Sequence, residues 1–177
     1  MKKIKKYRIF IASSLIIVFL LFFNNEIGLK AIDTVKFSFK EMITILPPIF
    51  ILMGLLDVWV PKETMSRYLG EDSGIVGILL AFFLGSAAAG PLYGAFPIAA
   101  VFMKKGVKFT NILIFIGAWS TTKLPMILFE IAAMGTKFAM TRFIINIFGI
   151  LLIAYLVNKS LSEKEIASIY KNAQESE

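Results

Sequence analysis

The stretch Ile75–Met103, IVGILLAFFLGSAAAGPLYGAFPIAAVFM, is 29 residues long and contains no Asp, Glu, Lys or Arg. Of the 177 residues in the chain, 58% are hydrophobic and 18% are charged, whereas about a quarter of a typical soluble domain is charged. A soluble chain of this length has too little interior to bury such a run, but a lipid bilayer covers it without a protein core. The stretch therefore predicts an all-α membrane protein, a polytopic helical bundle.

The length of this stretch fits neither one ordinary span nor two. One straight helix would measure about 43 Å against a hydrocarbon core of about 30 Å, and two spans would need about 40 residues. Its middle, Gly85–Pro97, holds three glycines and two prolines in 13 residues, which makes a poor helix interior. We therefore expect two half-helices that form a re-entrant hairpin, with the break between them covered by protein or by a water-filled cavity.

Outward from this stretch, the chain alternates apolar runs with polar segments. The segment Met1–Arg8, which holds five Lys and Arg residues, precedes an apolar run to Phe23, and no small-residue cleavage site follows that run. This predicts an uncleaved first span; the alternative is a cleaved signal peptide. We expect a transmembrane domain over residues 1–158 and a polar C-terminal tail over residues 159–177. The expected elements of the domain are a first span over 7–23, an interfacial amphipathic helix over 24–40, and further spans over 39–60 (kinked at Pro47-Pro48), 109–136 and 140–157.

The distribution of Lys and Arg favours the hairpin and a cytoplasmic N-terminus. If Ile75–Met103 turns back, the cytoplasmic segments hold 13 of these residues and the outer segments hold 5. If Ile75–Met103 crosses once, each side holds 9, which the positive-inside rule does not explain. Turning Phe109–Thr136 back as well gives 12 against 6, so whether that segment crosses once or turns back stays open.

The composition removes several classes of site. The chain has no Cys and no His, so it has no disulfide, no thiolate metal site and no imidazole ligand, and we expect neither a metal nor another cofactor. The net charge of +7 comes from Lys and Arg that flank apolar runs. Lipid headgroups explain these charges better than nucleic acid does, so the expected environment is the bilayer of the cell membrane.

The first candidate site is the break inside the 29-residue stretch. Backbone amides and carbonyls that a helix break frees can bind ions or polar groups of a substrate, with help from the helix dipoles. The alternative is a proline kink with close helix packing through small residues. The candidate residues are Gly90, Pro91, Tyr93, Gly94 and Pro97.

The second candidate site interrupts the run Phe109–Thr136. If this segment is one helix, Ser120, Lys123 and Glu130 lie within about 80° on one face. Charged side chains inside a membrane usually face a cavity or a partner, although Lys123 and Glu130 could also reach the two interfaces. Glu130, or Asp57 near the end of the second span, could take up a proton. The remaining candidates in this segment are Thr121, Thr122 and Pro125.

The chain resembles the predicted permeases that are related to organoarsenical efflux permeases, over roughly residues 42–156. The residues that carry the resemblance are Pro47-Pro48, Gly54, Val60-Pro61, Tyr68-Leu69-Gly70, Gly85, Gly90-Pro91, Gly94, Pro97, Lys105-Gly106, Ala118-Trp119-Ser120, Lys123-Leu124-Pro125, Phe129-Glu130-Ile131, Gly135, Lys137-Phe138 and Arg142.

The resemblance implies a transport role and highlights both candidate sites. Larger relatives carry two such halves in one chain, so a chain similar to one half implies a homodimer. The resemblance does not imply an arsenic substrate for this chain, because trivalent arsenicals bind thiolates and this chain has no cysteine.

We therefore expect a membrane permease, resembling a secondary transporter, that moves a small solute or ion along a path lined by discontinuous helices. The alternatives are a channel in which the hairpin acts as a filter, and a membrane scaffold or accessory subunit with no path. An enzyme is not expected, because the only candidate dyad, Ser120 with Lys123, is a weak signal.

Overall fold

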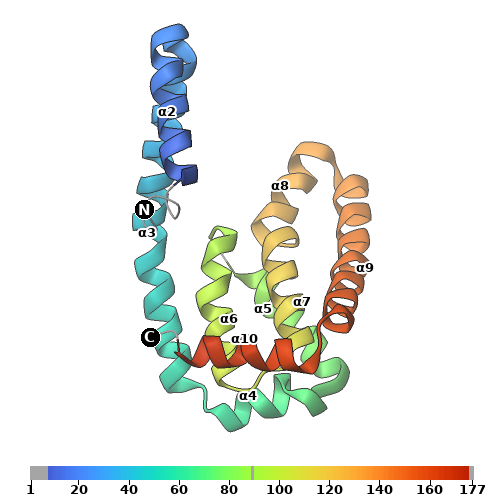
Figure 1. Cartoon of the computed structure of the whole chain (residues 1–177). Coiled ribbons are helices and arrows are strands. Elements are labelled where there is room, and N and C mark those ends of the chain that lie inside the picture. The colour runs from blue at the N-terminus through green and yellow to red at the C-terminus, as the bar shows by residue number, and fades with distance from the viewer. Residues whose placement is uncertain (1–7, 89, 176–177) are drawn as a thin grey trace. The chain divides into compact units, whose positions relative to one another are not determined.

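The computed structural model describes residues 8–88 and 90–175, and every regular element in those ranges is a helix. This confirms the all-α prediction. The chain divides into two compact units, Met1–Pro47 and Pro48–Glu177. The elements, labelled in Figure 1, are α2 (Arg8–Phe23), α3 (Asn25–Trp59), α4 (Lys62–Leu69), η1 (Glu71–Ser73), α5 (Gly74–Ala87), η2 (Leu92–Gly94), α6 (Ala95–Lys104), α7 (Phe109–Thr121), α8 (Leu124–Met134), α9 (Thr136–Ser160) and α10 (Glu163–Glu175).

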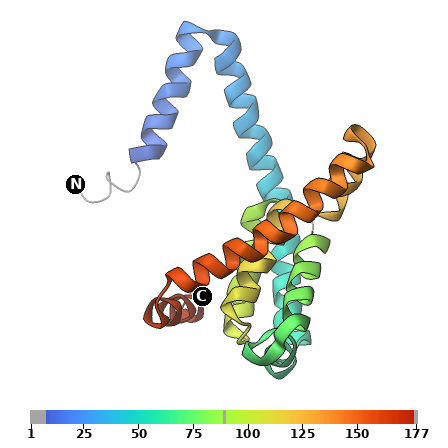
Figure 2. The ribbon, with the colours of Figure 1, turned by 90° about the vertical axis from the view of Figure 1, so that its right-hand side faces the viewer.

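The first unit contains α2 and the N-terminal part of α3, joined by the turn that Figure 2 shows. The Asn24 side chain caps the start of α3, because its Oδ1 accepts a hydrogen bond of 3.3 Å from the Ile27 amide. A Cβ on Gly28 would lie 2.8 Å from the backbone of Leu21, so the turn requires glycine at that position. The expected interfacial helix and second span form a single helix, α3, whose bounds include Pro47 and Pro48.

Among the residues that the structure describes, two helical segments are long and apolar enough to cross a membrane. There is a third if Lys62–Leu69 and Glu71–Ala87, which bend by 50° at a break, form one span. Phe109–Met134, made of α7 and α8, has 26 residues or about 39 Å, and α9 has 25 residues or about 37 Å. Figure 1 shows α7 and α8 in succession with α9 beside both of them. The run Phe109–Thr136 therefore extends in one direction as a broken helix, and the chain turns back at Gly135, whose φ is +85°.

The 29-residue stretch forms two short helices, as its length and its glycines and prolines predicted. The helix α5 has 14 residues, about 21 Å, and α6 has 10 residues, about 15 Å, so each is shorter than the hydrocarbon core. The Lys108 amide, just after α6, donates a 2.9 Å hydrogen bond to the Leu69 carbonyl, just before α5. The chain segments that flank the stretch thus lie together, as they would at the base of a hairpin.

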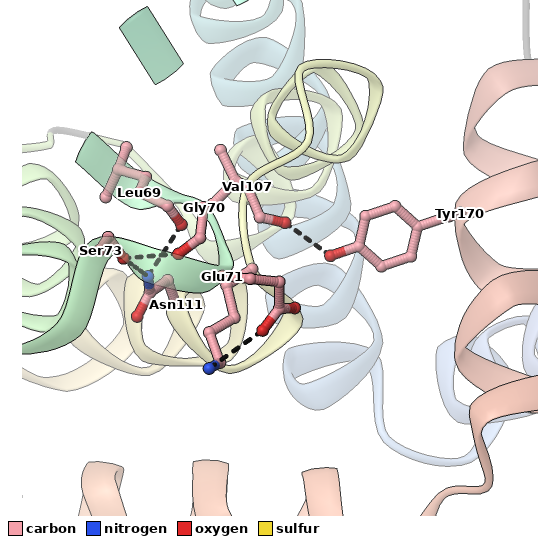
Figure 3. Close-up of polar contacts among 8 residues, drawn as sticks. Leu69, Gly70, Glu71, Ser73, Val107, Asn111 and Tyr170 are labelled. Carbon is pink, nitrogen blue, oxygen red and sulfur yellow. Dashed lines mark hydrogen bonds and ion pairs between the residues drawn. The ribbon is translucent and has the colours of Figure 1, made fainter. Parts of the chain in front are cut away.

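A polar network joins the segments at this end of the unit (Figure 3). The buried Asn111 amide donates hydrogen bonds to the Leu69 carbonyl at 2.9 Å and to the Ser73 hydroxyl at 3.1 Å. Lys108 forms an ion pair of 3.0 Å with Glu71. The network closes the base of the hairpin onto the start of α7.

The expected polar tail contains a helix, α10, that packs against α6. A reciprocal capping box starts it, because the Ser162 amide donates to the Glu165 carboxylate at 2.8 Å and the Glu165 amide donates to the Ser162 hydroxyl at 3.4 Å. The Tyr170 hydroxyl donates a 2.6 Å hydrogen bond to the Val107 carbonyl (Figure 3). The segment after α9 is therefore docked on the base of the hairpin.

Candidate functional site

The break in the hairpin follows α5, and its backbone carbonyls contact side chains from the α7–α8 segment. Gly90 has a φ of +103°, a left-handed conformation that glycine adopts without strain. The Trp119 indole nitrogen of α7 donates to the carbonyls of Gly90 and Pro91, at 3.3 Å and 3.2 Å. The Lys123 ammonium also donates to the Gly90 carbonyl. Two side chains from the neighbouring segment thus hold the break.

The second break separates α7 from α8 at Thr122 and Lys123. Pro125 explains it, because its ring clashes with the preceding turn of a continuous helix and it has no amide to donate to the Thr121 carbonyl. The Ser86 hydroxyl, at the end of α5, lies 2.9 Å from the Thr122 hydroxyl, and both residues are buried. The two breaks therefore face each other through a buried hydrogen bond and through Lys123.

A partly buried ion pair lies next to the second break. Arg142 of α9 donates from Nε to the Glu130 carboxylate at 2.8 Å and from Nη2 to the Thr121 carbonyl at 3.0 Å. Glu130 is 7% exposed, so its charge needs this partner. Arg142 supplies the hydrogen bond that Pro125 cannot, and it ties the orphan carbonyl of the break to the carboxylate of α8.

The structure separates the polar residues that a continuous helix would have aligned. Because the chain is not helical at Thr122 and Lys123, the expected common face of Ser120, Lys123 and Glu130 does not form. Lys123 reaches the hairpin, Glu130 reaches α9, and the exposed Ser120 hydroxyl donates to the Gly117 carbonyl at 2.8 Å.

Of the remaining candidates, those whose side chains the structure describes make no side-chain hydrogen bond to either break. Tyr93 is 39% exposed, and Gly94 is buried where a Cβ would lie 2.4 Å from Ile49 Cδ1. Pro97 is half-buried within α6, Pro125 is exposed, and the Thr121 hydroxyl donates to the Gly117 carbonyl at 2.9 Å. Asp57 lies in α3, but its side chain is outside the part of the chain that the structure describes.

Three residues of the site were not among the predicted path residues, namely Ser86, Trp119 and Arg142. Arg142 had a usable signal, since an arginine near the start of the expected last span requires a partner. Ser86 lies in a stretch of small residues that suggested packing alone. Trp119 lies before the predicted polar cluster, and nothing in its own neighbourhood shows that its indole reaches a break almost thirty residues earlier.

The residues of the site do not form a metal-binding cluster. Within residues 8–88 and 90–175, no group of three or more Asp, Glu, His or Cys side chains could hold a metal ion. The polar groups of the site are instead hydroxyls, one carboxylate, two cationic side chains and backbone carbonyls. This set can bind and orient a solute by hydrogen bonds and charge.

Comparison with known families agrees with this arrangement. Neither the curated proteins nor the solved structures yield a match. A family model described as a predicted permease matches residues 29–177, which include both breaks, the ion pair and α10. The chain therefore belongs to this family of predicted membrane permeases, which is related to the organoarsenical efflux permeases.

Proposed function

We propose that this permease works as a secondary transporter that carries a small solute past the two facing breaks. The observation that carries the proposal is the contact of Lys123 and Trp119 with the carbonyls of the hairpin break. Backbone groups freed at membrane depth must find partners, because the hydrocarbon region offers them no water. Movement of Lys123 or Trp119 would leave these carbonyls without partners, so their contacts hold the hairpin against α7 and α8 between transport steps.

The same contacts favour a carrier over a channel. In an open filter the carbonyls of the break would line the pore and meet the permeating ion. Here the Gly90 carbonyl accepts hydrogen bonds from two side chains of the α7–α8 segment. Passage then requires the hairpin to shift against α7 and α8, which is a conformational cycle of the kind that discontinuous helices support.

We propose the Glu130–Arg142 pair as the element that couples transport to protons. Protonation of Glu130 would remove its charge and weaken its hold on Arg142, which also holds the Thr121 carbonyl of the second break. A proton could thereby loosen the break that faces the hairpin. Asp57 remains the second candidate for proton uptake.

We propose that the base of the hairpin is cytoplasmic and that the hairpin is re-entrant in the cell membrane. The positive-inside count places the segments 61–73, 104–108 and 158–177 on the cytoplasmic side. The contacts of Lys108 with Leu69 and of Tyr170 with Val107 bring these three segments together. The excess of Lys and Arg before the first apolar run supports a cytoplasmic N-terminus as well. We further propose a homodimer, since the chain resembles one half of larger relatives.

The decisive experiment compares Lys123→Met with Lys137→Met. Both changes replace an ammonium by a thioether of similar length, but Lys137 is exposed and has no part in the site. Proteoliposomes with an imposed proton gradient are screened against a library of small solutes, and each accumulated solute is measured by mass spectrometry. We expect at least one solute that the wild type and Lys137→Met accumulate and Lys123→Met does not. Equal accumulation by all three proteins would reject the path.

A further inference from the structure

A cavity of about 370 Å³ lies beside the hairpin break. Its wall is made by the C-terminal part of α3, by α4, by both arms of the hairpin and by α7, all within the second unit. This volume falls within the range of roughly 300–1,000 Å³ that is usual for small-molecule sites. The lining residues on which the argument depends are Met65, Leu84, Ala88, Phe102, Phe115 and Trp119.

Three aromatic rings in series form one side of this cavity. The ring centroids of Phe102 and Phe115 are 4.9 Å apart, and those of Phe115 and Trp119 are 5.5 Å apart. Each of the three side chains is at most 3% exposed, so their positions are fixed by packing. A rigid aromatic wall offers a large apolar contact area to a small ligand.

The cavity and the break share Trp119 and Ala88. Trp119 lines the cavity with its ring, and its indole nitrogen holds the carbonyls of Gly90 and Pro91. Ala88 lines the cavity and ends α5. A ligand that fills the cavity therefore touches the residues whose movement the proposed transport cycle requires.

The lining also limits the charge of such a ligand. The cavity is lined by apolar side chains, so an ion would lose its hydration there without a compensating partner. Aromatic faces can attract organic cations, but the ammonium of Lys123 lies at the same Gly90 carbonyl that Trp119 contacts and would repel them. Both effects favour a neutral ligand.

We infer that this cavity binds the cargo of the permease, and that the cargo is an uncharged, largely apolar small molecule. The inference rests on the proposed function, because only a transport cycle makes the ligand a cargo. It narrows the cargo from any small solute or ion to one chemical class.

Tryptophan fluorescence tests the inference without transport. The chain has two tryptophans, and replacing the exposed Trp59 in a Trp59→Phe background leaves Trp119 as the only indole. Bromobenzene is titrated into this protein in detergent micelles, since bromine quenches an indole only at near contact. We expect quenching that saturates, whereas bromobenzene dissolved in the micelle alone would quench in proportion to its concentration.

Matched substitutions locate the binding. Ala88→Leu fills the cavity and should weaken the apparent affinity by about tenfold or more. Ala133→Leu makes the same change on an exposed face of α8 and should leave the affinity unchanged. Leu84→Phe narrows the cavity from another wall and replaces Ala88→Leu if that variant does not elute as a folded protein in gel filtration.

Three results would overturn the inference. Unsaturable quenching that is equal in all variants would mean that the cavity binds no such molecule. Equal affinity for the cation 4-bromo-N,N,N-trimethylanilinium would contradict an uncharged cargo. Saturable quenching by brominated phospholipid tails in nanodiscs, undiminished by unbrominated benzene, would mean that lipid fills the cavity.

The same data separate the inference from the proposed function. If binding at Trp119 saturates but transport does not depend on Lys123, the proposed transport path past the breaks is rejected and the cavity remains a ligand-binding site. Lys123-dependent transport with no binding at Trp119 would keep the path and reject the cavity as the cargo site.

Discussion

Gly85 lies where α5 packs closely against α7, and its replacement by alanine tests that packing. A Cβ on Gly85 would lie 2.4 Å from the Phe115 carbonyl oxygen, 2.8 Å from the Ala118 Cβ and 3.0 Å from the Trp119 amide nitrogen. Two of these atoms belong to the backbone of α7, so a change of side-chain conformation cannot relieve the clash. Gly85→Ala must push α5 away from α7, at the helix that carries Trp119.

The size of the effect follows from two opposing terms. Overpacking of a close contact costs about 1–3 kcal/mol. Replacing glycine by alanine inside a helix contributes about 0.5–1 kcal/mol of stability. Gly149 in α9 isolates the second term, because a Cβ there meets no atom within 4 Å. The free energy of unfolding of Gly85→Ala should therefore be about 1–3 kcal/mol lower than that of Gly149→Ala.

Thermal unfolding of the two purified variants in the same detergent measures this difference. For a chain of this size about 1 kcal/mol corresponds to roughly 2–4 °C in Tm, so Gly85→Ala should unfold roughly 2–12 °C below Gly149→Ala. We also expect Gly149→Ala to equal or exceed the wild type. An equal Tm for the two variants would mean that α5 does not contact α7 this closely. It would also contradict the arrangement in which the two breaks face each other.

Three other predictions test the ends of the hairpin, the ion pair and the docked C-terminal helix. Because the chain has no native cysteine, Glu71→Cys and Lys104→Cys each carry a single thiol, and an impermeant maleimide should label both from the cytoplasmic side; labelling from opposite sides would show a crossing. Replacing Glu130 and Arg142 by Gln, singly and together, should give a coupling energy of about 0.5–3 kcal/mol in unfolding measurements, and strict additivity would show that they do not pair. Burial, with the charge of Glu71, raises the pKa of Tyr170 to about 12, so the stability that its hydroxyl contributes is complete below roughly pH 10 and is lost as pH rises toward 12. The wild type should show this loss in pH-dependent unfolding, and Tyr170→Phe should not.

The two short helices of the 29-residue stretch were predictable because their causes are local. The length of the uncharged stretch and the positions of its glycines and prolines depend on neighbouring residues alone. The break before Pro125 has the same kind of cause. The capping box of Ser162 and Glu165 is also local, and it would have predicted a helix where we expected only a polar tail.

The partners of the breaks were not predictable in the same way. Nothing near Gly90 indicates that Trp119 and Lys123 hold its carbonyl, because these contacts depend on how α5 packs against α7. The pattern of charges also misled us at α3, where polar residues before Lys40 suggested a separate interfacial helix. Helical hydrogen bonds continue through a change of polarity, so α3 extends from Asn25 to Trp59.

The two breaks solve one physical problem in one way. Each break leaves a backbone carbonyl without a helical amide partner, Gly90 in the loop after α5 and Thr121 at the end of α7. A cation donates a stronger hydrogen bond to such a carbonyl than a neutral group does. Lys123 holds the first carbonyl and Arg142 holds the second. Lys123 itself lies in the second break, so a displacement of its ammonium from Gly90 changes both breaks together. In the proposed carrier, this linkage makes the state of the hairpin depend on the state of the α7–α8 segment.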